Sequence, residues 1–196
     1  SDNGGSWNTI GVDALNTGTM NFDTTTVTDG NQFLFRVTAN DDDSSNISTS
    51  ALVTVDNTAP TTIGVAAAPN PVVSGNNVTL TANTYDSFAV AGTQVSIIKN
   101  NSVITTLAMN EADGAFDEAD EDVTLSVNTT GWLAGTYQYY IAGTDNGSNT
   151  EVQTIVNTGT LTVISNDPYY TKVQVDSILL GNLSNYYNQT EINNIL

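Results

Sequence analysis

The chain has 196 residues, 39% of them hydrophobic, and a formal net charge of −18, a composition that supports globular cores rather than a disordered acidic chain. Phosphate backbones and anionic lipid surfaces are bound by clusters of Lys and Arg, which this chain lacks, so we expect no nucleic-acid partner. No apolar run reaches the ~20 residues that span a bilayer, so we expect no direct membrane insertion. The sequence contains no cysteine and no histidine, which removes disulfides, thiolate chemistry and the commonest general base, and we expect no enzymatic activity.

Residues 1–59 (unit one) contain four segments rich in Thr, Val and aromatic residues between Gly, Asn or Asp turns. They predict strands at 7–12, 19–23, 32–39 and 50–55. A complete immunoglobulin-like sandwich needs ~100 residues, so we expect unit one to be only the C-terminal half of one. Either strands that precede it belong to a longer protein from which this chain is cut, or another chain completes it by strand addition.

Residues 60–166 (unit two) predict a complete two-sheet sandwich. The alternation in Val78-Thr79-Leu80-Thr81-Ala82 places apolar side chains on a buried face and threonines in water. Asn100-Asn101 predicts a hairpin turn, because Asn tolerates positive φ. The predicted strands are 62–68, 77–84, 94–99, 103–109, 122–127, 136–144 and 159–165.

An internal repeat links the two units. Residues 23–41 and 128–145 are similar in sequence. Equivalent positions are 105 residues apart up to Gly30 and Gly135, and 104 apart after them. A repeat of this length is too long for a solenoid and is typical of tandem sandwich domains. Because only the second copy has a full sandwich around it, the units are predicted to be unequal.

Acidic residues crowd a predicted loop between two strands of unit two. Oxygen ligands at this density suit Ca²⁺, although the spacing is not that of an EF-hand and a solvated charged face is the alternative. The candidate ligands are Glu111, Asp113, Asp117 and Asp120.

Residues 167–196 (the tail) contain a second repeat, in which the segment 169–179 recurs as 186–196. Apolar residues at i, i+3 and i+4 predict two short amphipathic helices. Such helices cannot bury their apolar stripe alone, so the tail either docks on unit two or mediates self-association. The expected assembly residues are Tyr169, Tyr170, Val175, Ile178, Leu179, Tyr186, Tyr187, Ile192, Ile195 and Leu196.

Two resemblances extend this interpretation. Asp56-Asn57-Thr58-Ala59-Pro60, after the apolar run 51–55, resembles the junction phrase of bacterial and archaeal surface arrays of immunoglobulin-like (Big or cadherin-like) domains. Tyr169-Tyr170-Thr171-Lys172 and Val175-Asp176 resemble repeats of phage and viral fibres and of microbial surface stalks. Together they imply an extracellular location on a cell or virion surface and neighbouring domains of a longer chain as partners.

The topology implied by the resemblance predicts a further acidic cluster at the junction of the two units. It would bring together turns of both units and the linker, as in cadherin-type arrays that bind Ca²⁺ between domains. The alternative is that these are turn residues chosen for backbone geometry. The candidates are Asp29, Asp56, Asn57, Asp86 and Asp145.

These observations predict an all-β array of immunoglobulin-like sandwiches, incomplete in its first unit, with a short α-helical repeat segment at its C-terminus. The function we expect is that of a structural module in a fibre, stalk, filament or surface layer, with the sandwiches as spacers. The alternative is an adhesin or receptor-binding module that recognises glycan or protein.

Overall fold

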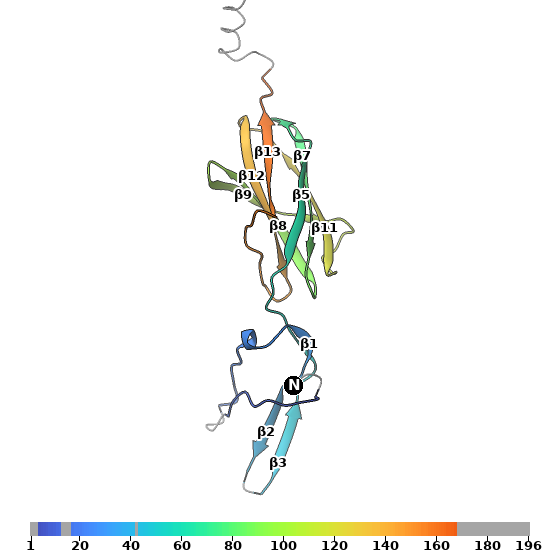
Figure 1. The fold of residues 1–196 in the computed structure, drawn as a ribbon, viewed down its shortest axis with the longest axis vertical. Helices are drawn as coiled ribbons and strands as arrows, with labels where there is room; N and C mark the ends of the chain where they lie inside the picture. The colour runs from blue at the N-terminus through green and yellow to red at the C-terminus, as the bar shows by residue number, and fades with distance from the viewer. Residues whose placement is uncertain (1–3, 13–16, 42, 168–196) are drawn as a thin grey trace, which may run out of the picture.

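The computed structural model describes residues 4–12, 17–41 and 43–167. Figure 1 shows these residues as two units placed end to end along the long axis of the molecule. Apart from one 3-10 turn, η1 (Thr24–Thr26), the regular structure of the described residues is β-strand. None of the helical structure in these residues has the length and apolar character needed to cross a membrane.

Unit two is a sandwich of two sheets, and its described strands confirm the all-β prediction. The first sheet has the order β10-β11-β7-β5, formed by Asn110–Glu111, Asp120–Asn128, Asn77–Tyr85 and Thr61–Ala68. The second has the order β6-β13-β12-β8-β9, formed by Val72–Val73, Thr158–Ile164, Gly135–Asp145, Val90–Lys99 and Ser102–Ala108. All neighbours are antiparallel except β6 and β13.

The core of unit two lies between these sheets. Successive residues of β7 alternate between exposed and buried, as Val78-Thr79-Leu80-Thr81-Ala82 predicts. The facing sheet contributes side chains from β8, β12 and β13 to the same cluster, among them Ile97, Tyr139, Ile141 and Leu161. This period of two results from strand geometry, in which side chains point alternately to the two faces.

Tyr137 closes one end of this core. Its hydroxyl donates to the Leu133 carbonyl oxygen (2.9 Å) and accepts from Lys99 Nζ (2.8 Å). Trp132 stacks on its ring at 4.7 Å between centroids and packs against the core. A buried tyrosine whose hydroxyl reaches back to the backbone a few residues upstream is a feature of immunoglobulin-type sandwiches. The predicted turn at Asn100 and Asn101 is also present, with φ of 53° and 62° between β8 and β9.

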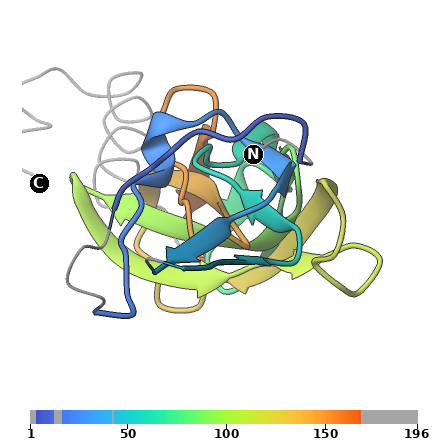
Figure 2. The ribbon, with the colours of Figure 1, turned by 90° about the horizontal axis from the view of Figure 1, so that it is seen from below.

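Unit one is smaller and differs from its prediction. Its strands form two separate two-stranded sheets, β1 (Gly30–Phe33) with β4 (Val53–Val55), and β2 (Arg36–Asn40) with β3 (Ser45–Thr49). The predicted strand 32–39 is therefore divided between two sheets, and β3 was not predicted. Segments 7–12 and 19–23 are not strands, and Figure 2 shows the N-terminal segment as an irregular trace around the short strands. A strand needs a neighbour to pair its backbone groups, and within the described residues these segments have none.

Other boundaries also shift. Strands β6 and β10 were not predicted, and β8 and β11 begin at Val90 and Asp120, earlier than expected. The acidic segment predicted as a loop is thus partly strand, because Asp120–Asn128 pairs with β7 over its whole length. The predicted helices and assembly residues of the tail lie outside the described residues.

Candidate metal centre

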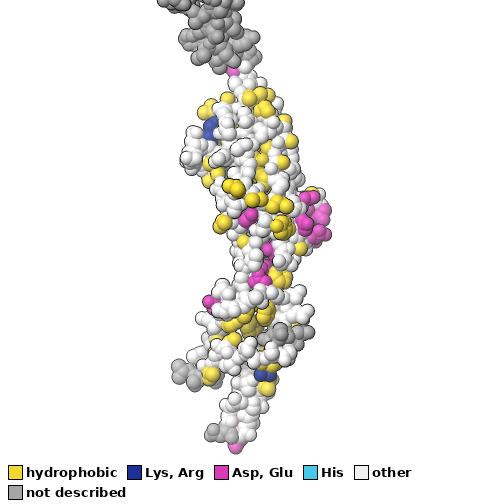
Figure 3. Space-filling view, viewed as in Figure 1, with side chains coloured by type: hydrophobic (Ala, Val, Ile, Leu, Met, Phe, Trp, Pro, Cys, Tyr) yellow, Lys and Arg dark blue, Asp and Glu magenta, His cyan; other side chains and the backbone are white. Residues whose placement is uncertain are grey.

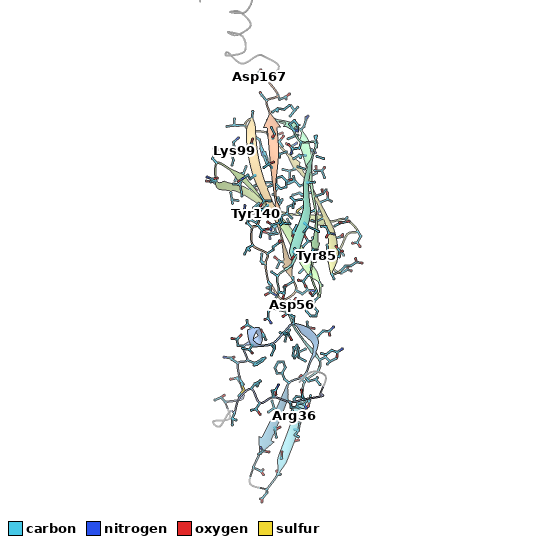
Figure 4. All side chains as sticks on the ribbon, viewed as in Figure 1. Arg36, Asp56, Tyr85, Lys99, Tyr140 and Asp167 are labelled. Carbon is cyan, nitrogen blue, oxygen red and sulfur yellow. The ribbon has the colours of Figure 1, made fainter. Side chains whose placement is uncertain are left out.

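Three aspartates meet at the junction between the units. Asp56 lies in the linker after β4, Asp86 directly follows β7, and Asp145 ends β12. Each offers a carboxylate oxygen, and these three oxygens all lie within 4.8 Å of one another. Figure 4 shows Asp56 at the waist of the molecule, where the linker enters unit two. Three of the five junction residues predicted from topology are therefore brought together.

The turn after β12 fixes Asp145. The residue is 2% exposed, and its carboxylate accepts from the Asn149 backbone N–H (2.9 Å) and from Asn149 Nδ2 (2.8 Å). The same Nδ2 donates to the backbone oxygen of Asp56 (3.1 Å). Asn149 thus ties the turn to the linker. It was not predicted, although an Asn four residues after an Asp in a Gly- and Ser-containing turn is a usable signal.

Asp86 is held by its own turn. Its Oδ1 accepts from the backbone N–H of Phe88 (2.9 Å), which leaves its second oxygen outside that hydrogen bond. Asp86 as a whole is only 8% exposed. Two of the three carboxylates are thus buried in positions set by neighbouring backbone.

Burial, together with the negative charge of the cluster, raises the pKa of Asp56. Burial is the main cause, and the negative charges of Asp86, Asp145 and Asp29 add to it. A like charge nearby disfavours ionisation in the same direction as burial does. Burial and like charge thus act in the same direction on Asp56.

The described basic residues are occupied elsewhere. The Arg36 guanidinium lies 4.2 Å from the ring centroid of Trp7, and Lys99 Nζ donates to the Leu133 carbonyl oxygen (3.0 Å). Figure 4 shows both residues well away from Asp56 along the long axis. Among the described residues, therefore, neither of these basic side chains lies beside the three aspartates.

Asp29 and Asn57 have a different role from the one predicted. Asp29 accepts from the Asn57 backbone N–H (2.8 Å), from Asn57 Nδ2 (3.1 Å) and from the Thr58 hydroxyl. These hydrogen bonds lower the pKa of Asp29, and the bond from Thr58 has the largest effect. Asn57 Oδ1 accepts from the Thr24 hydroxyl (3.1 Å). This network attaches the linker to unit one, and neither residue contributes to the group of three carboxylates.

The second predicted set does not converge. Figure 3 shows acidic side chains projecting from the side of unit two, apart from those at the waist. Asp120 accepts from Asn83 Nδ2 (2.6 Å), and Glu111 accepts from backbone N–H groups of its own turn. Within the described ranges, Glu111, Asp113, Asp117 and Asp120 do not form a group with ligand-like spacing. Glu121, in the same acidic segment, is buried and accepts from the backbone N–H groups of Asp117 and Glu118.

The turn after β10 is expected to respond to acid through Glu111. Hydrogen bonds from the backbone N–H groups of the turn, that of Asp113 first, lower the pKa of Glu111 from 4.5 to about 2. A lowered folded-state pKa means that its stabilisation of the turn is complete above pH 4.5 and is lost as the pH falls towards 2. Carboxyl ¹³C NMR should show Glu111 titrating near 2, and Glu111→Gln should remove the accompanying amide shifts of Asp113 and Ala115. Titration at 4.5 would contradict the hydrogen-bonded turn.

Comparison with known proteins gives distant structural similarity only. No family model matches the chain, and no curated protein matches it. The CARDB domain of a Pyrococcus furiosus protein, in complex with di-metal ions, matches at 14% identity and a TM-score of 0.34, covering 55% of this chain and 94% of that one. CopC from Methylosinus trichosporium OB3b matches at 17% identity and a TM-score of 0.35, covering 56% and 100%.

Proposed function

We propose that this chain is a non-enzymatic structural module of an extracellular fibre, stalk, filament or surface layer. The observation that carries the proposal is the end-to-end placement of the two units, in which β4 leads through residues 56–60 directly into β5 (Figure 1). A spacer must keep successive domains in line. A linker of this length, bound by side chains on both sides, limits the freedom of one unit relative to the other.

Hydrogen bonds on both sides of the linker support this role. On the side of unit one, Asp29 binds Asn57 and Thr58. On the side of unit two, Asn149 binds the backbone oxygen of Asp56, and Glu151 Oε1 accepts from the Thr62 backbone N–H (3.1 Å) where β5 begins. The linker is therefore held at its start, its middle and its exit.

The three aspartates add a cation to the proposal. Ca²⁺ prefers carboxylate and carbonyl oxygens, and its sites combine side chains with backbone oxygens and water. Asp56, Asp86 and Asp145 supply carboxylates from the linker and from two turns of unit two. A bound Ca²⁺ would convert their mutual repulsion into attraction and stiffen the junction. This cation would be structural, since the site offers no nucleophile or general base beyond the carboxylates.

The adhesin alternative has less support. Glycan-binding sites commonly contain exposed aromatic rings, and the hot spots of protein-binding surfaces are also rich in aromatic residues. Among the large hydrophobic residues exposed in the described part of the chain, Tyr85 is the one aromatic and the others are aliphatic. This composition favours a spacer over a binding tip.

The assembly role of the tail is tested by removing it. Light scattering on the full chain should give a mass above that of a monomer, and deletion of residues 167–196 should reduce it to the monomer, because the apolar stripes predicted there need a partner. The matched control replaces Ile178 and Ile195 with Ser in the full chain, which removes apolar area without shortening it. If the mass is the same with and without the tail, its assembly role is lost.

A further inference from the structure

Asparagine or aspartate followed by glycine is a chemically reactive pair, and the described residues contain three such pairs. The backbone nitrogen of the glycine can attack the side-chain carbonyl carbon of the residue before it, because no Cβ obstructs the approach. The reaction needs a side chain that is free to move and a glycine nitrogen that no hydrogen bond holds. The pairs are Asp29-Gly30, Asp113-Gly114 and Asn146-Gly147, and a further pair, Asn3-Gly4, begins outside the described residues.

Two of the three pairs are restrained. The Asp29 carboxylate accepts from the Asn57 backbone N–H (2.8 Å), and Gly30 is the first residue of β1. In the second pair, the Gly114 N–H donates to the Glu111 carboxylate. The first pair therefore has a fixed side chain, and the second has a glycine nitrogen that is already engaged.

The third pair meets both conditions. Asn146 and Gly147 are exposed in the turn that follows β12. Among the described residues, the Asn146 side chain has no hydrogen-bond partner and the Gly147 N–H donates to no acceptor. Asn146 also carries a neutral amide, which is more open to nucleophilic attack than the ionised carboxylates of the other two pairs.

We propose that Asn146 deamidates spontaneously in the folded protein and that the product loosens the junction between the units. The Gly147 nitrogen bonds to the side-chain carbonyl carbon of Asn146, and the amide nitrogen leaves as ammonia with the proton of the Gly147 N–H. Water then opens the resulting succinimide ring. Attack at the side-chain carbonyl gives aspartate, and attack at the main-chain carbonyl gives isoaspartate, in which the backbone runs through the side-chain carbon.

The modified turn is the one that binds the linker. Asn149 Nδ2 joins the Asp145 carboxylate (2.8 Å) to the backbone oxygen of Asp56 (3.1 Å). Gly147 lies against the same groups, since a Cβ on it would be 3.1 Å from Asp145 Oδ1 and 3.3 Å from the Asp56 backbone oxygen. Isoaspartate adds a backbone carbon to this close-packed turn, and aspartate adds a negative charge beside the three carboxylates. The inference goes beyond the proposed function, because it needs neither a bound cation nor assembly.

The test compares Asn146 with a second asparagine–glycine pair whose glycine nitrogen is held. Asp113→Asn provides it, because the Gly114 N–H can still donate to Glu111. The folded full chain with this substitution is incubated at mildly alkaline pH. Chymotryptic peptides are then analysed by mass spectrometry with electron-transfer fragmentation, which distinguishes aspartate from isoaspartate. Position 146 should convert at least about tenfold faster than position 113, the effect of one hydrogen bond to a charged group, and the two rates should be similar in urea.

A second variant and a second measurement complete the test. Asn146→Gln keeps the amide but closes the corresponding ring far more slowly, so it should abolish the product at this position. Conversion of the parent chain should speed amide hydrogen exchange at Asn149, whose N–H donates to Asp145, and leave exchange in β7 unchanged. Equal conversion of positions 146 and 113 in the folded chain, or an intact Asn146 after position 113 has converted, would overturn the assignment of the site. Unchanged exchange at Asn149 after conversion would overturn the effect on the junction.

Discussion

Addition of Ca²⁺ is expected to stabilise unit two by about 2.7 kcal/mol when its free concentration is 100 times the Kd. The reason is that Asp56, Asp86 and Asp145 hold three carboxylate oxygens within 4.8 Å of one another. The basic residues that the structure describes contact other groups and do not neutralise these charges. An ion that binds the folded site and not the unfolded chain shifts the equilibrium by mass action. Thermal unfolding in Ca²⁺ and in chelator measures the effect as an increase in melting temperature of several degrees.

Asp86→Asn separates a specific site from a general effect of salt on an acidic protein. The amide oxygen of Asn can still accept from Phe88 N–H, so the turn is preserved while one of the repelling charges is removed. In chelator, the variant should melt at or slightly above the temperature of the parent, because like charges destabilise each other. In Ca²⁺, its increase in melting temperature should be largely lost.

Asp117→Asn is the matched control. It makes the same change in charge on an exposed residue of unit two outside the cluster, and it should keep the full response to Ca²⁺. An equal response of the parent and both variants would mean that Ca²⁺ only screens the net charge. No response in the parent would remove the ion from the proposed function and leave the hydrogen-bonded linker as the sole source of stiffness.

Leu80→Ala is expected to destabilise unit two by about 2–5 kcal/mol, because it combines lost burial with a cavity in the core. Leu80 is 0% exposed and lies on β7 between β11 and β5, with Leu125 and Ala67 as its ladder partners. Close packing on both sides limits how far the surroundings can relax into the space. A loss of this size is a large part of the stability of a small domain.

The measurement is denaturant unfolding followed by the fluorescence of Trp132, in a Trp7→Phe background that removes the second tryptophan. Thr81→Ala, on the exposed face of the same strand, is the control and should change the free energy of unfolding by no more than about 0.5 kcal/mol. Similar effects of the two substitutions would contradict the burial pattern of β7 and with it the assignment of its inner face.

The sandwich of unit two follows from local signals that the structure confirms. The alternation from Val78 to Ala82 requires one face of that segment to be buried, and two consecutive asparagines at Asn100 and Asn101 suit a turn with positive φ. Both signals arise within a few residues, where backbone sterics and side-chain period act directly. The strand boundaries were less accurate, since the acidic residues that begin β11 gave no apolar signal.

Unit one shows why the same signals fail without partners. Residues 32–39 have the composition of one continuous strand, as their counterpart in β12 is, yet they are divided between β1 and β2. In unit two, β13 pairs with residues 135–140 of β12 and β8 pairs with residues 138–145, so that β12 has a neighbour along its whole length. Composition sets the tendency to extend, but cross-strand pairing decides whether an extended segment becomes a single strand.

By itself, the sequence determined the class of fold, the unequal size of the two units and the acidic character of their junction. Only the tertiary structure decided that Asp56, Asp86 and Asp145 converge, that Asn149 links two of them, and that Asp29 and Asn57 bind each other instead. The physical reason is one of range. Periodicity and turn chemistry are properties of adjacent residues, whereas the meeting of three carboxylates depends on the register of strands far apart in sequence and on the path of the linker between them.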